Sequence, residues 1–409
     1  MRILYHHRTR GGDAQGVHIA EMQRAFRARG HEVEEVSLVP TAAAVSADGV
    51  AAAGPAGARW ADRAARRAPR LPRELLELAY NAVAYRRLAR AIRRLRPDLV
   101  YERYAAFTFA GVLAARRHRV PIVLEVNSPL AAERARHGGL ALGPIARAAE
   151  RWACARADLT VVVSTELARA LAAEGIAPRR LRVLLNGVRR GFGAGSRARG
   201  RRRLGIDDDR LVVGAVAWFR PWHRLEDLLA GFDDPAVAAT GAVLALVGGG
   251  PAVDPPSPRL ARLVADGRAV LAGAVQRDEL EDVLAALDVA VQPAVTPYAC
   301  PMKLVEYLAA GCAVVAPGSP NVRELVGDDG EAALLCGSGP EPTPAELREG
   351  LLRLLGDPRL RARLGSAARG RVERAGLYWE ENARRVEEEL AALASPASRA
   401  AVSLEARPC

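Results

Sequence analysis

Short apolar runs rich in Val, Ile and Leu alternate along the sequence with longer stretches in which apolar residues recur at a helical period. Such runs predict buried strands, and their alternation with helices predicts parallel sheets covered on both faces. In the first half, strands are expected at 3–5, 33–39, 99–101, 122–126, 159–163 and 183–185. In the second half, they are expected at 211–216, 243–247, 270–271, 289–291 and 313–316.

This pattern stops once and restarts, which predicts an α/β protein of two doubly wound lobes. The interruption at 189–203 has no apolar period and is rich in Gly and Arg, so it predicts a linker. We expect an N-terminal lobe at 1–190, a C-terminal lobe at 191–377, a loose Ala/Gly-rich loop at 41–58 and a flexible tail at 396–409. Because such lobes bind ligands beyond the carboxyl ends of their strands, a shared ligand would lie in a cleft between them.

Composition narrows the class of protein. The chain has 409 residues, of which 50% are apolar, enough for two large cores. No apolar run reaches the roughly 20 residues of a membrane-spanning helix, and residues 1–15 lack the apolar segment of a signal peptide. Five cysteines without a C-x-x-C pair argue against a disulfide framework and a zinc cage. These features predict a cytoplasmic protein.

The formal net charge of +12 is concentrated in one stretch. Residues 59–96 contain twelve arginines against three acidic residues, with apolar residues interleaved, as in a basic amphipathic helix. Two interpretations remain open: a segment that approaches an anionic membrane, or a solvated helix pair rich in arginine. The stretch also admits a different class of function, a basic membrane or nucleic-acid adaptor. Basicity alone is weak evidence for nucleic acid, since 58 of the 59 basic residues are arginine, and we expect no such partner.

Two glycine stretches are candidate phosphate contacts. Gly11, Gly12 and Gly16 separate the first predicted strand from a helix at 17–29, where free backbone N–H groups can take a phosphate. Gly249 lies in a Gly-Gly-Gly-Pro loop directly after another strand. Neither stretch forms G-x-G-x-x-G, which argues against a nicotinamide or flavin site. Plain turns are the alternative interpretation for both.

The most informative segment is a predicted helix that starts after Pro301 and ends at Gly311. Its open N-terminus suits a diphosphate, and Lys303, the only lysine of the chain, adds a charge in the first turn. Glu306 follows three residues later on the same helix face, where its carboxylate can accept hydrogen bonds from the two hydroxyls of a ribose. A simple salt bridge between Lys303 and Glu306 is the structural alternative.

Several segments together resemble a known family, the retaining glycosyltransferases of family 4 (group 1). In order, they are GVHIAEMQRAFRARGHEV at 16–33, CARADLTVVVSTELARAL at 154–171, LNGV at 185–188, LVGGGP at 246–251, LDVAVQP at 287–293 and KLVEYLAAGCAVVAP at 303–317. The resemblance implies a GT-B fold, two Rossmann-like lobes facing a cleft, with a helix at 378–395 returning to the first lobe. It also implies sugar transfer from a nucleotide diphosphate sugar with retention, without a metal ion or separate cofactor.

The resemblance assigns roles in the second lobe, where the family pattern is E-x7-E. Its second glutamate falls on Glu306, which is expected to hold the donor ribose. Its first falls on Tyr298, so a carboxylate expected at the donor sugar is missing here. We expect the backbone around Met302 and Lys303 to carry more of the sugar and diphosphate contacts instead.

Further candidates follow from the same resemblance. The family places an arginine and a lysine after the first strand of the second lobe; here Arg220 and Arg224 are the candidate cations, and His223 stands near the lysine position. Asn127 occupies the place of a histidine that reaches the donor sugar, and it is our candidate catalytic residue, because an amide can hydrogen-bond a sugar hydroxyl.

Glu125 and Arg103 end neighbouring predicted strands of the first lobe. They can line the same cleft as Asn127, or they can form a structural ion pair.

The acceptor is left open by the sequence. We expect a lipid-linked or polysaccharide glycan, with the enzyme held peripherally at the inner face of the membrane by residues 59–96. A small-molecule natural product is the alternative acceptor. A nucleotide-sugar epimerase is a further alternative, but it needs dedicated acid and base carboxylates, and Tyr298 does not favour it.

Overall fold

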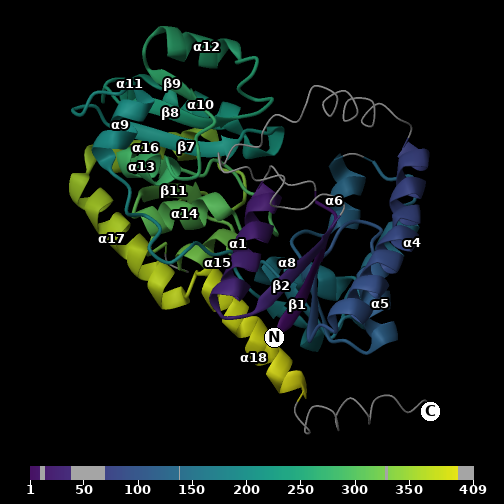
Figure 1. Cartoon of the computed structure of the whole chain (residues 1–409). Coiled ribbons are helices and arrows are strands. Elements are labelled where there is room, and N and C mark those ends of the chain that lie inside the picture. Colours follow the sequence, from purple (N-terminus) through teal and green to yellow (C-terminus); the bar gives the residue numbers. More distant parts are fainter. Residues whose placement is uncertain (10–13, 38–69, 138, 328–329, 395–409) are drawn as a thin grey trace. The chain divides into compact units, whose positions relative to one another are not determined.

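Two six-stranded parallel sheets, one in each of two compact units, organise the chain (Figure 1). The computed structural model describes residues 1–9, 14–37, 70–137, 139–327 and 330–394. Unit 1 comprises Met1–Ser46, Ala51–Leu185 and Trp379–Cys409, and unit 2 comprises Ala47–Val50 and Asn186–Tyr378. The sheets confirm the doubly wound α/β fold. The predicted loop at 41–58, Gly11, Gly12, residues 59–69 and the tail at 396–409 lie outside the described residues.

Unit 1 is built around a sheet of order β2-β1-β3-β4-β5-β6. Its strands are β1 Arg2–His7, β2 Glu32–Ser37, β3 Leu99–Arg103, β4 Ile122–Val126, β5 Leu159–Val162 and β6 Leu181–Val183. Its helices are α1 Ala14–Ala28, α4 Arg70–Leu95, α5 Ala110–His118, α6 Leu130–His137, α7 Gly143–Arg156, α8 Thr165–Ala173, a 3-10 turn at Pro178–Arg180, and α18 Trp379–Ala394. Every residue of β3, β4 and β5 is buried, because helices cover both faces of a parallel sheet.

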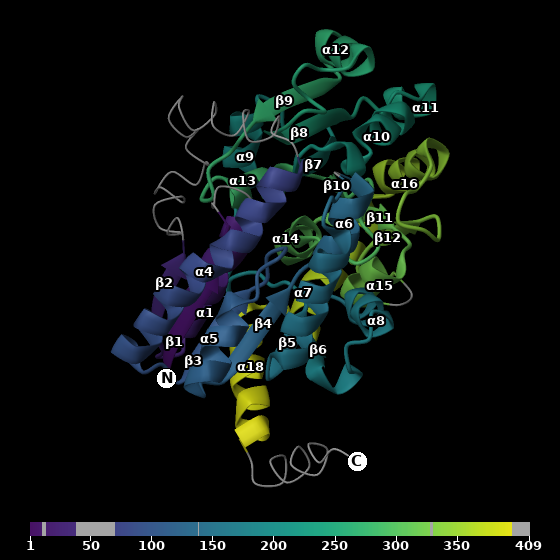
Figure 2. The ribbon, with the colours of Figure 1, turned by 90° about the vertical axis from the view of Figure 1, so that its right-hand side faces the viewer.

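The long helix α4 packs beside α5 in unit 1 (Figure 2). Leu88, Ala91 and Ile92 are buried on one side of α4, at helical spacing. No helix in the described part of the chain combines the length and apolarity that crossing a bilayer requires.

The last described helix, α18, lies beside α1 although more than 300 residues separate them in sequence (Figure 1). Glu387 accepts hydrogen bonds from Arg29 at 2.5 and 2.8 Å and contacts His31 Nε2 at 2.7 Å. Trp379, at the start of α18, is 1% exposed and packs edge-on against His18, with ring centres 4.6 Å apart. Helix α18 is therefore an integral part of unit 1.

Unit 2 has a sheet of order β12-β11-β10-β7-β8-β9. Its strands are β7 Val212–Trp218, β8 Val243–Gly249, β9 Ala269–Gly273, β10 Val289–Val291, β11 Ala313–Pro317 and β12 Leu334–Cys336. Its helices are α9 Arg197–Leu204, a 3-10 turn at Pro221–His223, α10 Leu225–Phe232, α11 Pro235–Ala238, α12 Pro258–Ala265, α13 Leu280–Ala286, α14 Met302–Ala310, α15 Pro320–Val326, α16 Pro344–Gly356 and α17 Pro358–Ala375. The edge strand β12 was not expected, because only the last of its three residues is buried and they form no continuous buried run, unlike those of the equally short β10.

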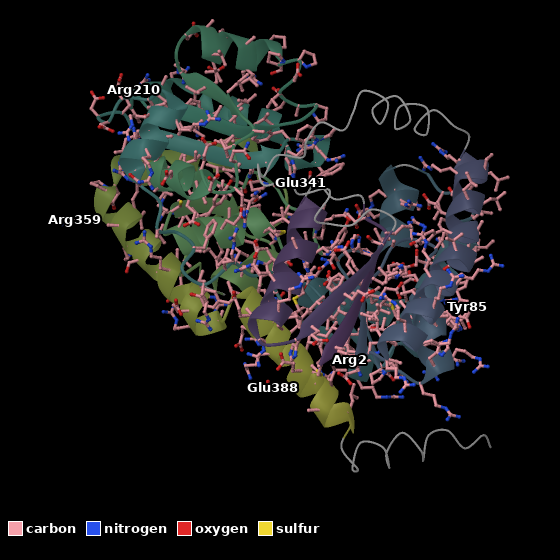
Figure 3. The ribbon with its side chains drawn as sticks, viewed as in Figure 1. Arg2, Tyr85, Arg210, Glu341, Arg359 and Glu388 are labelled. Atoms are coloured by element: carbon pink, nitrogen blue, oxygen red, sulfur yellow. The ribbon has the colours of Figure 1, made fainter. Side chains whose placement is uncertain are left out.

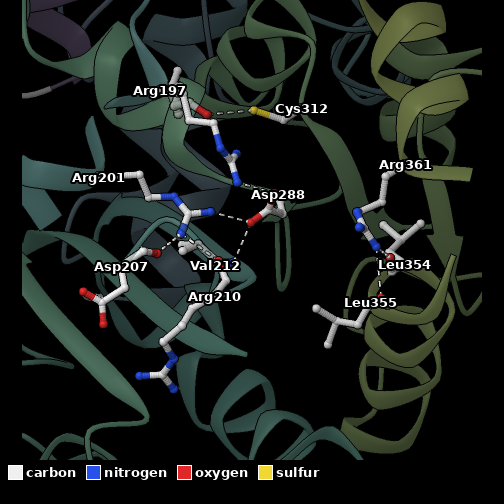
Figure 4. A network of polar contacts seen from close by, with 11 residues as sticks. Arg197, Arg201, Asp207, Arg210, Val212, Asp288, Cys312, Leu354, Leu355 and Arg361 are labelled. Atoms are coloured by element: carbon white, nitrogen blue, oxygen red, sulfur yellow. Dashed lines mark hydrogen bonds and ion pairs between the residues drawn. The ribbon is translucent and has the colours of Figure 1, made fainter. Parts of the chain in front are cut away.

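The prediction of a linker at 189–203 is wrong for its second half, which forms helix α9. Arg201 in this helix is 1% exposed, and its guanidinium donates to the Asp288 carboxylate at 2.8 Å and to the carbonyls of Asp207 and Arg210 at 2.7 and 2.6 Å (Figure 4). A helix that is buried through a hydrogen-bonded arginine carries no apolar period, so the sequence pattern could not reveal it.

Candidate functional site

The carboxyl edge of the unit 2 sheet gathers most of the residues that the sequence singled out. Strands β10, β7 and β8 are neighbours and run parallel, so the segments that follow them, 292–301, 219–224 and 250–257, leave the sheet at the same edge. Arg220, His223 and Arg224 lie on the second segment, and Lys303 and Glu306 lie on α14 directly after the first. Ligand sites of doubly wound α/β proteins form at this carboxyl edge of the sheet.

Helix α14 begins at Met302 without a side-chain cap. Its N-cap, Pro301, has extended backbone angles and provides no capping hydrogen bond, so the first N–H groups of the helix are open to an anion. The loop before it is held by Asn186, whose side chain donates to the Cys300 carbonyl at 2.6 Å, and by Asn321, which donates to the Ala299 carbonyl at 2.7 Å. These two contacts fix the backbone that leads into the helix start.

Glu306 is buried at 1% exposure yet remains charged. One carboxylate oxygen accepts from Lys303 Nζ at 3.0 Å, and the other accepts from the Arg277 guanidinium. Burial raises the pKa of Glu306, but the charges of Lys303 and Arg277 outweigh it, so the pKa lies below its usual range. The neighbouring Tyr307 hydroxyl accepts from the Val216 backbone N–H at 2.7 Å, which fixes α14 against β7. The salt bridge expected as the structural alternative is therefore present, within a larger network.

Arg277 is a member of this network that sequence reasoning missed. It lies between β9 and α13, and its guanidinium carbon is 5.5 Å from the centre of the Phe192 ring, a cation–π geometry. The backbone N–H groups of Gly193 and Ala194 donate to Glu281 Oε2 at 2.9 and 3.2 Å, which holds the Phe192 loop against α13. A charged residue in a predicted loop gives no signal of such a contact.

The glycine loop after β8 is required by backbone geometry. Gly248 and Gly250 both have φ of +122°, and a Cβ on Gly248 would lie 1.9 Å from the Ala217 carbonyl oxygen. A Cβ on Gly249 would lie 3.0 Å from the Trp218 ring. Gly248 and Gly250 let this segment run close to the end of β7, whereas the ring near Gly249 is exposed and free to move, so a role of Gly249 toward a ligand stays a prediction.

The three basic candidates after β7 differ in their surroundings. His223 Nδ1 accepts from the Arg220 backbone N–H at 3.0 Å, and burial together with the nearby Arg220 charge lowers the pKa of His223. This shift favours the neutral form of His223, so His223 supplies less positive charge than the lysine of the family pattern, and its role toward a ligand stays a prediction. Arg224 Nε donates a hydrogen bond to Asp227 Oδ2 at 2.5 Å. Arg220 stacks over Trp222 at 5.2 Å and forms no ion pair within the described part of the chain, so it is the cation available to a ligand.

In unit 1, Asn127 follows β4 and Gly16 lies in the first turn of α1. The Asn127 amide nitrogen is 3.4 Å from His18 Nδ1, and its oxygen is buried with no hydrogen-bond partner among the described residues. Asn127 therefore retains an acceptor for a ligand hydroxyl. Within the described ranges, no three His, Cys, Asp or Glu side chains are grouped as metal ligands.

Glu125 lies inside unit 1 with its partners. It accepts from Arg103 at 2.6 Å, from the Tyr101 hydroxyl at 2.8 Å, and from His18 Nε2 at 3.0 Å. Burial raises the pKa of Glu125, but His18 and Arg103 outweigh it and lower the pKa to about 2. Because Glu125 and Arg103 are both buried, the geometry favours the structural ion pair over a role toward ligand.

Two family profiles match the sequence. The profile of Glycosyltransferase Family 4 matches residues 15–191, and that of Glycosyl transferases group 1 matches residues 210–357. The chain belongs to these glycosyltransferases. The first profile covers most of unit 1 and ends a few residues inside unit 2, and the second contains Arg220, Lys303 and Glu306. A comparison with curated proteins finds no match.

Solved structures with similar folds are glycosyltransferases or related enzymes. Anabaena HepE in complex with UDP superposes with a TM-score of 0.70 at 17% identity, covering 96% of this transferase and 100% of that chain. Sucrose-phosphate synthase from Thermosynechococcus elongatus gives 0.67 at 17% identity, covering 96% and 99%. WaaG, a glycosyltransferase involved in lipopolysaccharide biosynthesis, gives 0.63 at 15% identity, covering 94% and 98%. The GT-B fold class is therefore confirmed for this transferase.

Proposed function

We propose that this transferase moves a sugar from a nucleoside diphosphate sugar to an acceptor hydroxyl, with retention at the anomeric carbon and without a metal ion. The observation that carries the proposal is the start of α14, where an ionised, buried Glu306 stands one turn after an uncapped helix N-terminus and beside Lys303. A carboxylate there suits the ribose hydroxyls, and the helix start suits a diphosphate. HepE, which is similar in fold, is described in complexes with UDP and UDP-glucose, so uridine donors are the first to test.

Charge stabilisation is the chemistry that this site supplies. As the glycosidic bond breaks, negative charge develops on the leaving diphosphate, and fixed donors aimed at it lower the barrier. In this proposal the negative charge of the leaving diphosphate is stabilised by two cations, Lys303 and Arg220, and by the open backbone N–H groups of α14. They take the place of a metal ion in the proposal. Tyr298 offers no carboxylate to the sugar, so sugar selection depends more on the backbone N–H groups at the start of α14.

Turnover of a donor panel tests the proposal. The purified chain is incubated with EDTA, one uridine, guanosine, adenosine or thymidine diphosphate sugar, and candidate acceptors, and the product is examined by NMR. We expect release of the nucleoside diphosphate and a glycoside with the anomeric configuration of the donor. Inverted product would contradict retention, and activity abolished by EDTA would contradict metal independence.

A lipid-linked glycan at a membrane is the acceptor that the surface of α4 favours. The helix exposes large apolar side chains in its first half and arginines in its second, and Figure 3 shows nitrogen-tipped side chains along it near Tyr85. The apolar residues are Leu71, Leu75, Leu76 and Val83; the arginines are Arg86, Arg87, Arg90, Arg93 and Arg94. Leu76 is 73% exposed. This combination suits the boundary between anionic headgroups and acyl chains.

A further inference from the structure

A second cationic cluster lies in unit 1 and has no role in the donor site. It surrounds Glu77 on α4 and draws on three elements: Arg8 after β1, Arg73 one helical turn before Glu77, and Arg134 on α6. Arg134 donates to both carboxylate oxygens of Glu77, one of them at 3.0 Å. Arg8 Nη2 lies farther from the same carboxylate, 3.5 Å from Glu77 Oε2. Arg134 and Arg8 therefore share the Glu77 carboxylate, and Arg73 acts on it only through its nearby charge.

The hydrogen-bond donors of this cluster are not used up. Arg8 Nη1 and Arg73 Nε are both buried and have no hydrogen-bond partner among the described residues. The adjacent carboxylate of Glu74 does not serve them, because its two oxygens accept from the backbone N–H groups of Ala141 and Leu142 at 3.0 and 2.7 Å. Buried guanidinium donors without acceptors are costly, so a bound anion that accepts from them would stabilise the cluster.

Two aromatic rings hold the guanidinium groups in place. The Arg8 guanidinium carbon is 5.8 Å from the centre of the Tyr80 ring, and that of Arg134 is 5.9 Å from the centre of the Phe107 ring. Burial raises the pKa of Glu77, but Arg134, Arg8 and Arg73 outweigh it and lower the pKa, so Glu77 stays charged and orients Arg134. The result is a preformed arginine fork, the geometry that proteins use for phosphate and carboxylate.

We propose that Arg8, Arg73 and Arg134 form a binding subsite for a phosphoryl group, and that the group belongs to the acceptor. Arg8 directly follows β1, so the subsite lies at the carboxyl edge of the unit 1 sheet, on the same helix as the exposed apolar residues of α4. The link to the acceptor rests on the proposed transferase function. The binding of a phosphoryl anion does not, because it involves no residue of the donor site.

Calorimetric titration with inorganic pyrophosphate at constant ionic strength tests the subsite. The full chain carries Lys303→Ala, so that the donor site contributes little. Arg8→Gln and Arg134→Gln should each weaken binding about fivefold or more, since each removes a charge-assisted hydrogen bond. Arg169→Gln, which removes an exposed arginine paired with Glu166 in the same unit, should change nothing. Glu77→Gln should tighten binding, because it removes the competing carboxylate, and this gain cannot come from misfolding.

Equal affinity of Arg8→Gln, Arg134→Gln and Arg169→Gln for pyrophosphate would overturn the subsite, as would weaker binding by Glu77→Gln. Competition separates the sources of the phosphoryl group. Displacement of pyrophosphate by phosphatidylglycerol vesicles but not by phosphatidylcholine vesicles supports a lipid source, whereas displacement by glycerol phosphate alone supports a soluble acceptor. If pyrophosphate binds as predicted but no donor sugar is turned over, the proposed function fails while the subsite stands.

Discussion

Glu306 shows how a buried carboxylate can stay ionised when cations hold both of its oxygens. Lys303 comes from the same helix, one turn earlier, and Arg277 comes from the loop after β9. Sequence spacing predicts the first contact, because residues three apart share a helix face. It cannot predict the second, which depends on how a distant loop folds over α14. The same holds for Glu77 and Arg134, which meet across 57 residues.

Arg277 should control the protonation of Glu306. Since the cations lower the pKa of Glu306, Arg277→Ala should raise it toward the usual range. A protonated Glu306 accepts hydrogen bonds less well, so the variant should lose nucleotide affinity as pH falls, and at a higher pH than the wild type. We expect the affinity ratio of wild type to variant to be greater at about pH 5 than at about pH 8, with partial rescue by Arg277→Lys. Titration calorimetry at both pH values measures this affinity ratio. A ratio independent of pH would exclude control of Glu306 protonation by Arg277.

Glu125 should make the free energy of unfolding of unit 1 depend on pH in the acidic range. Its folded pKa of about 2 lies below its value in an unfolded chain, so its contribution is complete above the unfolded pKa and is lost as pH falls toward 2. At about 1.4 kcal/mol per pH unit, the loss is about 3 kcal/mol. Glu125→Gln should be less stable than wild type at neutral pH and closer to it near pH 2–3 in urea denaturation. A stability difference that stays constant with pH would contradict this.

At the scale of elements, periodicity predicted the strands well and missed two short or polar elements. The runs at 122–126, 243–247 and 289–291 are buried strands, because a strand covered on both faces needs a continuous apolar run. Strand β12 lies at the sheet edge and is only partly buried, so it has no continuous buried run, and α9 is a helix with eight residues, five of them arginine. Its fold depends on the burial of Arg201 by contacts far along the chain.

Helix α18 should be essential to unit 1. Trp379→Ala removes a side chain that is 1% exposed, and such core truncations cost about 3–5 kcal/mol. Leu393→Ala, on the same helix at 38% exposure, should change the free energy of unfolding by about 0.5 kcal/mol or less. Chemical denaturation compares the two variants. Equal small effects would mean that α18 does not belong to the core of unit 1.

At the scale of the molecule, the exposed face of α4 predicts membrane association that depends on charge. Changing Arg86, Arg87, Arg90, Arg93 and Arg94 to Gln should abolish flotation with anionic liposomes, because each basic residue near the surface contributes about 1 kcal/mol. Donor affinity should be unaltered, since none of these residues belongs to unit 2. If the wild type does not float with anionic liposomes even at low salt, a soluble acceptor becomes the better hypothesis.

The start of α14 is the proposed binding site of a nucleoside diphosphate sugar. A thermal-shift titration of wild type and Glu306→Ala with uridine, guanosine, adenosine and thymidine diphosphate sugars is its direct test. A ligand that binds only the folded state stabilises it by about 2.7 kcal/mol at 100 times its Kd. We expect one base to raise the melting temperature of the wild type, and Glu306→Ala to need about tenfold more of it for the same shift. No shift with any donor, or equal shifts in both proteins, would rule out donor binding through Glu306 at the start of α14.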